Sequence, residues 1–420
     1  MELGKFIIEK SKALQGTVRV NGSKNSVLPI LAATLLAEQK CVIRDVPVLT
    51  DVAIMKKLLE NLGATVCWDE KEEAIYAETK KIIKTEADYE LVSQMRASFL
   101  LMGPLLSRFG KVKIPLPGGC QIGSRPVDLH LKGFASLGAE IKNEHGYVEA
   151  TAKKLKGANI YLDFPSVGAT ENIMMAAVLA EGQTIMQNCA IEPEVVDLAS
   201  FLNSMGADIR GTGTDTIRIN GVSKLSGCEH TIIPDRIEAG TFMVAAGLSG
   251  GNVIIENVVS DHLKPVIAKL RESNIAVTET ETGINIISDG NFLPTDIKTL
   301  PYPGFPTDMQ AQFMSLLATT EGTSVVIETV FENRFMHVGE LKRMGANIKI
   351  EGRSAVVEGV KQLTGTQVKA TDLRAGAALI LTALTAEGKT EIGDIYHIER
   401  GYFGIDEKLR RLGAKIKKVD

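Results

Sequence analysis

The chain has 420 residues, a length that favours two domains over a single hydrophobic core. Hydrophobic residues make up 45% of it and charged residues 23%, as in an ordinary globular protein. The net charge of −4 argues against nucleic acid and acidic lipid as partners, so an anionic ligand would need cations gathered locally. Five scattered cysteines and six unclustered histidines support neither a disulfide framework nor a metal site. We expect no signal peptide or membrane span, and a cytoplasmic protein.

One short motif recurs along the whole chain at intervals of 68 to 75 residues. The copies are Leu62-Gly-Ala-Thr-Val66, Leu137-Gly-Ala-Glu-Ile141, Met205-Gly-Ala-Asp-Ile209, Ser273-Asn-Ile-Ala-Val277, Met344-Gly-Ala-Asn-Ile348 and Leu412-Gly-Ala-Lys-Ile416. In each copy an amphipathic helical segment precedes the motif, the glycine predicts the end of that helix, and a β-branched strand follows. The spacing therefore predicts six repeated units.

Each unit also contains an apolar helix rich in small residues, followed by a glycine turn and a strand. These predicted helices cover residues 26–35, 97–106, 172–180, 241–248, 312–318 and 375–386. Because they carry hardly any charge, we expect them to be buried on most sides. We expect the amphipathic helices to lie on the outside of sheets, with the apolar helices packed within.

Cys120 lies in a segment rich in proline and glycine, Pro115-Leu-Pro-Gly-Gly-Cys-Gln-Ile-Gly-Ser-Arg125, which predicts a loop. Lys111, Lys113 and Arg125 flank the thiol, and nearby positive charge favours its reactive thiolate form. The alternative is a small apolar residue that happens to lie in a turn.

Charged residues stand at the predicted starts of several apolar helices, where free N–H groups and the helix dipole favour anions. They are Lys24 with Asn25, Arg96, Asp308, and Asp372 with Arg374; Arg334 and Arg400 precede amphipathic helices. Taken singly, each arginine is better explained by a surface salt bridge, but the recurrence at equivalent ends favours a binding site. The segment 163–171 indicates either an anion or sugar contact or a turn capped by Ser166 or Thr170. No GxGxxG or Walker motif is present.

The six units and several motifs resemble the enolpyruvyl transferase family. Within that family they resemble the branch that uses a UDP-sugar, since the shikimate-pathway branch lacks the cysteine loop. The motifs are Ser23-Lys-Asn25, Met95-Arg-Ala-Ser98, Pro117-Gly-Gly-Cys120, Arg125-Pro-Val-Asp-Leu-His130, Phe305-Pro-Thr-Asp-Met-Gln310, Phe331-Glu-Asn-Arg-Phe335, Ala370-Thr-Asp-Leu-Arg374 and Ile398-Glu-Arg-Gly401.

The resemblance implies a two-domain inside-out α/β barrel built from six βαβαββ-type repeats, three per domain. One domain would span 22–233, and the other would combine 1–21 with 234–420. In this arrangement the beginning of the chain crosses back to the second domain.

The resemblance also implies the reaction: the enolpyruvyl group of phosphoenolpyruvate moves to the 3′-hydroxyl of UDP-N-acetylglucosamine with release of phosphate, by addition and elimination, as the first committed step of peptidoglycan synthesis. No metal or organic cofactor is implied. Cys120 would be the general acid and could form a covalent adduct with phosphoenolpyruvate. Asp308 would act as the base on the 3′-hydroxyl or orient it, with Lys24 and Arg400 as further catalytic residues.

The remaining assignments concern binding. Phosphoenolpyruvate would contact Lys24, Asn25, Arg125, Arg334, Arg374 and Arg400. The UDP-sugar would contact Asn25, Arg96, Arg125, Pro126, Val127, Asp128, Leu129, Ser166, Val167, Gly168, Asp308 and Val330. Phe164 and Leu100 depart from some relatives, which puts a phosphate contact at position 164 in doubt. The alternatives are an enolpyruvyl transferase of the 3-phosphoshikimate type and a regulatory paralogue that binds the UDP-sugar.

Overall fold

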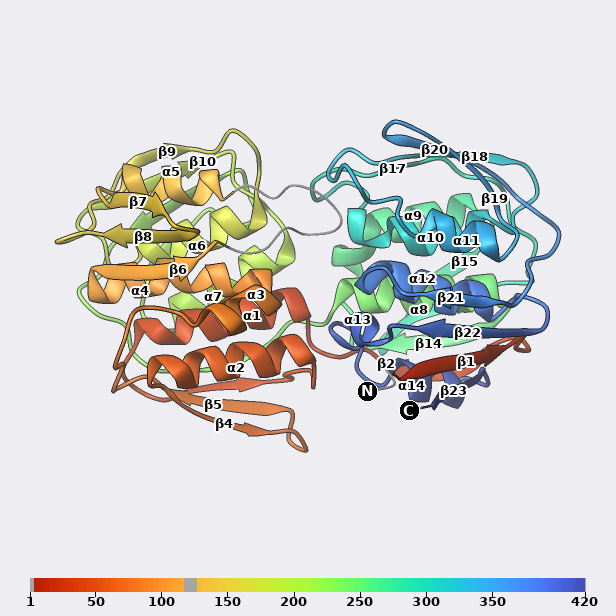
Figure 1. The fold of residues 1–420 in the computed structure, drawn as a ribbon, viewed down its shortest axis with the longest axis horizontal. Coiled ribbons are helices and arrows are strands. Elements are labelled where there is room, and N and C mark those ends of the chain that lie inside the picture. The colour runs from red at the N-terminus through yellow and green to blue at the C-terminus, as the bar shows by residue number, and fades with distance from the viewer. Residues whose placement is uncertain (1–3, 117–126, 420) are drawn as a thin grey trace. The chain divides into compact units, whose positions relative to one another are not determined.

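The computed structural model describes residues 4–116 and 127–419, so Cys120, Arg125 and Pro126 lie outside the described residues. The described chain forms two compact units. We call residues 22–116 with 127–233 the N unit, and residues 4–21 with 234–419 the C unit (Figure 1).

The described residues of the N unit form three sheets, two mixed and one antiparallel, and in each a hairpin pairs with a strand from elsewhere in the chain. The first has the order β13-β3-β5-β4, with β13 parallel to β3 and the other pairs antiparallel. The other two have the orders β6-β8-β7 and β11-β12-β10-β9. The strands are β3 (Cys41–Arg44), β4 (Thr65–Asp69), β5 (Ala74–Glu78), β6 (Lys111–Pro115), β7 (Glu140–Glu144), β8 (Tyr147–Thr151), β9 (Asn159–Tyr161), β10 (Gln183–Gln187), β11 (Asp208–Arg210), β12 (Thr216–Asn220) and β13 (Glu229–Thr231).

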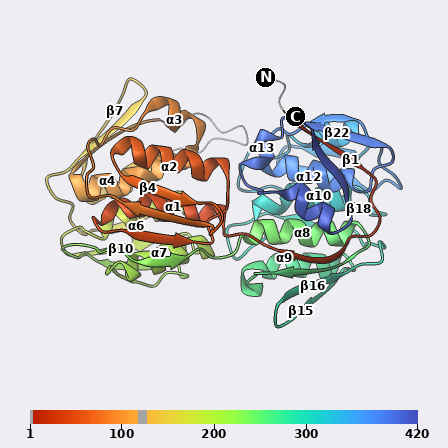
Figure 2. The ribbon, with the colours of Figure 1, turned by 90° about the horizontal axis from the view of Figure 1, so that it is seen from below.

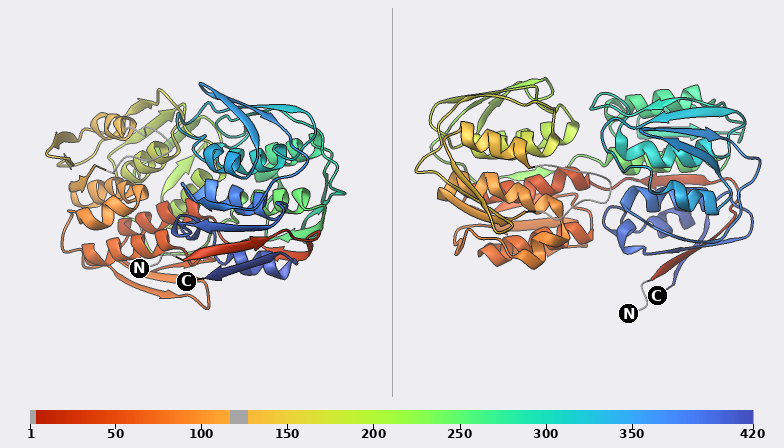
Figure 3. Two further views of the ribbon diagram at one scale, coloured as in Figure 1. Left: turned by 45° about the vertical axis from the view of Figure 1, so that its right-hand side comes forward. Right: turned by 45° about the horizontal axis from the view of Figure 1, so that its top comes forward.

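The described residues of the C unit form three four-stranded sheets, and two of them contain strands from the beginning of the chain. Strand β1 lies between β22 and β23, and β2 pairs in parallel with β14 (Figure 3). The sheet orders are β21-β22-β1-β23, β15-β16-β14-β2 and β17-β18-β20-β19. The strands are β1 (Lys5–Glu9), β2 (Gln15–Arg19), β14 (Asn252–Glu256), β15 (Ala276–Glu279), β16 (Gly283–Ile287), β17 (Ile297–Lys298), β18 (Thr323–Ile327), β19 (Asn347–Glu351), β20 (Ser354–Glu358), β21 (Gln367–Lys369), β22 (Lys389–Gly393) and β23 (Lys415–Val419).

The apolar helices predicted from the sequence form the interior of each unit. In the N unit these are α1 (Lys24–Ala33) with η1 (Thr34–Leu36), η2 (Arg96–Leu101) with α4 (Met102–Phe109), and α6 (Val167–Ala177). In the C unit they are α8 (Arg236–Leu248), η4 (Thr307–Met309) with α10 (Gln310–Leu317), and α12 (Leu373–Ala383), which contact one another (Figure 2). Several begin before the apolar stretch, because polar residues form the first helical turn, as in α8 and α12.

The amphipathic helices do not cover the outer faces of the sheets, so that expectation was wrong. Strands such as β10 and β16 bury alternate residues, which leaves each of these sheets one solvent-facing side. Helix α2 instead packs against α1 and β4 on the buried side. The amphipathic helices are α2 (Thr50–Leu62), α5 (Asp128–Ser136), α7 (Pro193–Ser204), α9 (Lys264–Glu272) after η3 (Ser260–Leu263), α11 (Val338–Arg343) and α14 (Ile405–Arg411); α3 (Tyr89–Gln94) and α13 (Tyr396–Glu399) are short.

The repeated glycine ends these amphipathic helices, as predicted. The residue at the glycine position of every motif copy has a positive φ, from 91° to 108° at the five glycines. In the degenerate copy Asn274 has φ 65°, a conformation that asparagine tolerates better than most residues.

The chain passes between the two units at Gly22 and at Ile233, and the two connections lie side by side. The Ser23 amide donates to the Ile233 carbonyl at 2.7 Å, and the Asp235 amide donates to the Asn21 carbonyl at 2.9 Å. A Cβ atom at Gly22 would lie 1.9 Å from the Asp45 carbonyl oxygen, so this close approach requires glycine.

In the described part of the chain, every helix is too short or too polar to cross a membrane.

Candidate active site

In the C unit, two buried arginines hold one carboxylate at the start of a core helix. Asp308 lies in η4, directly before α10. The Arg334 Nη2 atom lies 2.7 Å from Asp308 Oδ1, and Arg374 donates to Asp308 Oδ2 from Nη2 at 3.0 Å and from Nε at 3.2 Å. The structure therefore brings together three residues that the sequence places far apart.

Solvent reaches the carboxylate of this cluster more easily than it reaches the arginines. The Arg334 and Arg374 side chains are 3% and 5% exposed, whereas the Asp308 side chain is 26% exposed. Burial alone would lower the pKa of Arg374, but Tyr402, Asp308 and Asp235 raise it above its ordinary value, so the guanidinium stays charged. Two fixed cations beside an accessible carboxylate form a site that can attract an anion.

Local hydrogen bonds fix the helix starts from which these side chains extend. The Asp372 carboxylate caps α12 by accepting from the amides of Arg374 at 2.9 Å and Ala375 at 3.1 Å. Beneath Asp308, the Gln312 Nε2 atom donates to the Asp308 carbonyl at 2.9 Å and to the Tyr402 hydroxyl at 3.3 Å. The position of the Asp308 backbone therefore depends on buried polar contacts as well as on its ion pairs.

Two further predicted site residues of the C unit are Arg400 and Val330. Arg400 directly follows α13. The pKa of His397 is lowered first by burial of the imidazole and then by the positive charge of Arg400. Val330 follows β18 in the same connection that carries Arg334.

In the N unit, Lys24 is the first residue of α1 and pairs with a carboxylate that the sequence analysis did not identify. Its Nζ atom lies 2.7 Å from Asp51 Oδ2, and the two side chains are 10% and 3% exposed. The neighbouring Asn25 is exposed. Asp51 is the second residue of α2 and has no sequence signal beyond its place in a helical first turn, where acidic residues are common.

A second group in the N unit gathers several residues assigned to the UDP-sugar around His130. His130 lies in α5, two residues after Asp128, and the Nδ1 atom of its ring lies 3.0 Å from Asn172 Nδ2. Because the Asn172 amide donates this bond, Nδ1 accepts and the ring proton of the neutral imidazole lies on Nε2. Burial, and then the charge of Arg96, lower the pKa of His130 to about 3.

The start of α6 lies against this imidazole. A Cβ atom built on Gly168 would lie 3.4 Å from the Cε1 atom of His130, so a larger residue would crowd the ring. Ser166 is the cap of α6 and accepts from the Ala169 amide at 3.4 Å. The structure thus brings Arg96 and the segment 166–168 to His130, while in the stretch before His130 Val127 is buried, Asp128 exposed and Leu129 partly exposed.

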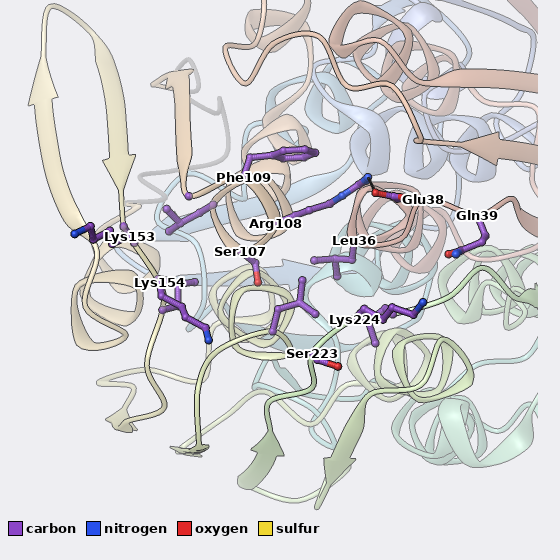
Figure 4. Close-up of a pocket in the computed structure, with 16 residues that line it drawn as sticks. Leu36, Glu38, Gln39, Ser107, Arg108, Phe109, Lys153, Lys154, Ser223 and Lys224 are labelled. Atoms are coloured by element: carbon purple, nitrogen blue, oxygen red, sulfur yellow. Dashed lines mark ion pairs between the residues drawn. The ribbon is translucent and has the colours of Figure 1, made fainter.

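A hollow in the N unit lies apart from these residues (Figure 4). It has a volume of about 580 Å³ and is lined by Arg108, Lys153, Lys154 and Lys224 among others. Its walls come from the carboxyl ends of η1 and α4, where exposed carbonyl groups favour cations, and Arg108 donates to the Leu35 carbonyl at 2.7 Å. Arg108 therefore compensates these helix ends, Lys154 pairs with Glu181, and the described residues that line the hollow include none of the predicted site residues.

Comparisons with known proteins identify the family of this chain. The family model described as EPSP synthase (3-phosphoshikimate 1-carboxyvinyltransferase) matches residues 8–409. The chain belongs to this family. It is 64% identical over 412 residues to UDP-N-acetylglucosamine 1-carboxyvinyltransferase 1 of Caldanaerobacter subterraneus subsp. tengcongensis, covering 98% of this chain and 99% of the relative. It is 61% identical over 417 residues to UDP-N-acetylglucosamine 1-carboxyvinyltransferase 2 of Carboxydothermus hydrogenoformans, covering 99% of each.

Solved structures of this family share the fold. The enolpyruvyl transferase NikO from Streptomyces tendae superposes with a TM-score of 0.89 at 25% identity, covering 100% of this chain and 99% of that one. EPSP synthase from Acinetobacter baumannii superposes with a TM-score of 0.76 at 19% identity, covering 99% and 100%. The chain therefore has the α/β enolpyruvyl transferase fold.

The sequence analysis missed several buried polar residues beside the predicted site. Asp51, His130, Asn172 and Glu328 each hold a predicted site residue or its segment in place. Their partners come from distant parts of the chain, so only His130, within the motif 125–130, could have been suspected from the sequence.

Proposed function

We propose that the protein transfers the enolpyruvyl group of phosphoenolpyruvate to the 3′-hydroxyl of UDP-N-acetylglucosamine, with release of phosphate. The observation that carries this proposal is the 64% identity, over nearly the full length of both chains, to a relative with that substrate in its name. In a bacterium this reaction is the first committed step of peptidoglycan synthesis.

The cluster around Asp308 supports this chemistry. Phosphoenolpyruvate carries a phosphate and a carboxylate, and Arg334 and Arg374 are buried cations that already bind a carboxylate. We propose that the substrate competes for these arginines, which would leave Asp308 able to accept a proton from the sugar hydroxyl. Lys24, Asn25, Arg125 and Arg400 would complete the phosphoenolpyruvate site.

The N unit would supply most of the UDP-sugar site. Arg96, residues 127–129 and the segment 166–168 surround or adjoin His130, whose neutral imidazole offers its Nε2–H as a hydrogen-bond donor. Arg125 and Pro126, outside the described residues, are proposed to extend this site. Val330, Asn25 and Asp308 would contact the sugar. The proposed domains are 22–233 and 1–21 with 234–420, each an inside-out barrel of three βαβαββ-type repeats.

The direct test is a phosphate-release assay with phosphoenolpyruvate and each of two acceptors. We expect turnover with UDP-N-acetylglucosamine and none with 3-phosphoshikimate. Turnover with 3-phosphoshikimate alone would replace the proposed acceptor, and binding of the UDP-sugar without any turnover would indicate a regulatory protein.

The proposed acid, Cys120, has its own test. Replacing the thiol by a hydroxyl removes both the acid and the nucleophile, so we expect Cys120→Ser to lose most activity and to resist alkylation by the epoxide fosfomycin. Cys120→Asp keeps an acid and should retain activity without being alkylated. Unchanged alkylation of Cys120→Ser, detected by mass spectrometry, would assign the reaction to another cysteine.

A further inference from the structure

A buried carboxylate lies behind the Asp308 cluster, in a position that the mechanism above does not use. Glu328 directly follows β18 and is 1% exposed. Within the described part of the chain, no basic side chain pairs with it. Its charge is instead compensated by hydrogen bonds, which a buried carboxylate requires.

Four donors from three segments converge on this carboxylate. Its Oε1 atom accepts from the Thr299 hydroxyl at 2.9 Å and from the amides of Val330 at 2.8 Å and Phe331 at 3.1 Å. Its Oε2 atom accepts from the Thr307 hydroxyl at 2.9 Å. Hydrogen bonds to an ionised acceptor are stronger than those between neutral groups.

One of these segments contains Asp308, and another leads to Arg334, with which Asp308 forms an ion pair. Thr307 is the residue before Asp308, in the short helix η4. Val330 and Phe331 begin the connection that leads to Arg334, and the Phe331 ring lies 5.4 Å from the Arg334 guanidinium carbon. Glu328 thus joins the backbone that carries the carboxylate to the backbone that carries one of its arginines.

We propose that Glu328 is a positioning residue for Asp308 and the Val330–Arg334 connection, acting through Thr307 and through the two backbone amides. This inference rests on the proposed function, because Asp308 and Val330 are its proposed substrate contacts. A displacement of about 1 Å at a reacting group can cost as much as 100-fold in rate. Because Glu328 holds Thr307, the residue next to Asp308, its loss is expected to lower turnover.

The variants Thr307→Val and Thr299→Val separate positioning from general stability. Each removes one hydroxyl that donates to Glu328, but only Thr307 adjoins Asp308. The Thr299 hydroxyl also accepts from the Thr329 amide at 2.9 Å, so Thr299→Val perturbs the Val330 side of the connection and leaves the Thr307 bond beside Asp308 in place. We expect Thr307→Val to lower kcat about 10-fold or more with a change in the KM for phosphoenolpyruvate of less than about threefold. Thr307→Ser, which keeps the hydroxyl, should restore kcat, and Thr299→Val should leave it within about twofold.

The variant Glu328→Gln tests the carboxylate itself. Its amide preserves the size of the side chain but cannot accept at both ends, so we expect a loss of kcat similar to that of Thr307→Val. Because both changes break the same connection, the double variant should fall no further than the more severe single variant. A normal kcat in Thr307→Val, equal losses in Thr299→Val, or independent losses in the double variant would overturn the proposal.

Hydrogen exchange of the substrate-free protein provides a readout that does not need the proposed reaction. In Glu328→Gln, amide exchange should accelerate in 307–309 and in 330–334, but not in the N unit. Unchanged exchange there would contradict the anchor even in an active enzyme. Conversely, a wild-type protein that fails to turn over the substrates would contradict the proposed function while leaving the exchange result to decide the role of Glu328.

Discussion

Asp308 is the residue on which the proposed chemistry and the local electrostatics both depend. Asp308→Asn keeps the shape of the side chain but removes the base and the charge between Arg334 and Arg374. We expect kcat to fall by about 10² to 10⁴, the usual contribution of a general base. Because Asp308 is partly exposed, the loss of its ion pairs should cost only about 1–3 kcal/mol of unfolding free energy. Phosphate-release kinetics and urea unfolding measure the two effects.

Inorganic phosphate provides a further check on this variant. An added anion can compensate the two arginines, so phosphate should stabilise Asp308→Asn more than it stabilises the wild type. Asp261→Asn is the control, because Asp261 forms only an exposed pair with Lys264 in the same unit. Full activity in Asp308→Asn would remove Asp308 from the mechanism.

The buried imidazoles predict how stability depends on pH. Burial lowers the pKa of His130 to about 3 and that of His337 to about 4, both below the ordinary value of 6.5. Below pH 6.5 the unfolded chain takes up protons that the folded chain does not, so stability falls as the pH falls. Each histidine should contribute a slope approaching about 1.4 kcal/mol per pH unit between its two pKa values.

His130→Asn isolates one of these contributions. The unfolding free energy, measured in urea, should fall between pH 6 and pH 4.5 in both proteins. We expect the slope of this fall to be shallower in the variant than in the wild type by about 1 kcal/mol per pH unit. His145→Asn changes an exposed histidine in the turn between β7 and β8 and serves as the control. An equal change of slope in both variants would show that the buried imidazole is not its source.

At the scale of the elements, the repeated glycine permits a test of backbone conformation alone. Gly206 has φ 105° and no atom within 4 Å of a Cβ built there, so Gly206→Ala introduces strain without a clash. We expect a loss of about 1–2 kcal/mol in urea unfolding. Gly63→Ala should cost more, because its Cβ would lie 2.6 Å from the Lys81 carbonyl oxygen.

Gly339 is the matched control for these substitutions. It lies within α11 with an ordinary φ and also has no atom within 4 Å of a Cβ built there. Gly339→Ala should therefore be neutral or stabilise the C unit by up to about 1 kcal/mol. Destabilisation equal to that of Gly206→Ala would mean that the positive φ is not the cause.

The helix ends were predictable because their causes are local. The glycine after Leu62 or Met205 ends a helix through its own φ, and Asp372 caps α12 through amides two and three residues away. The recurrence of charged residues at equivalent helix starts suggested that Asp308, Arg334 and Arg374 share a site, but their ion pairs could not be read from the sequence, since these contacts join separate repeats. Glu328 was missed because its burial and its two threonine donors, Thr299 and Thr307, have no local signature in the sequence; only the amides two and three residues after it are local donors.

At the scale of the whole molecule, the first strand of the chain pairs with two strands near the other end of the chain. Phe6 in β1 is 1% exposed and lies opposite Ile392 in β22 and Lys418 in β23. The core of the C unit therefore includes a side chain that is separated in the sequence from residues 234–419 by all the residues of the N unit. This long-range pairing makes the stability of residues 234–419 depend on residues 4–21.

Phe6→Ala tests this dependence. Removing a buried phenylalanine side chain should cost the C unit about 3–5 kcal/mol, because the cavity left behind adds to the lost burial. Hydrogen exchange should accelerate in β22, β23 and the other C-unit strands, while β10 and β12 of the N unit keep their protection. Phe201→Ala is the reciprocal control, because Phe201 is fully buried in α7 and belongs to the N unit. If Phe6→Ala accelerated exchange equally in both units, the two would unfold as one cooperative body, and the separate contribution of β1 to the C unit would be refuted.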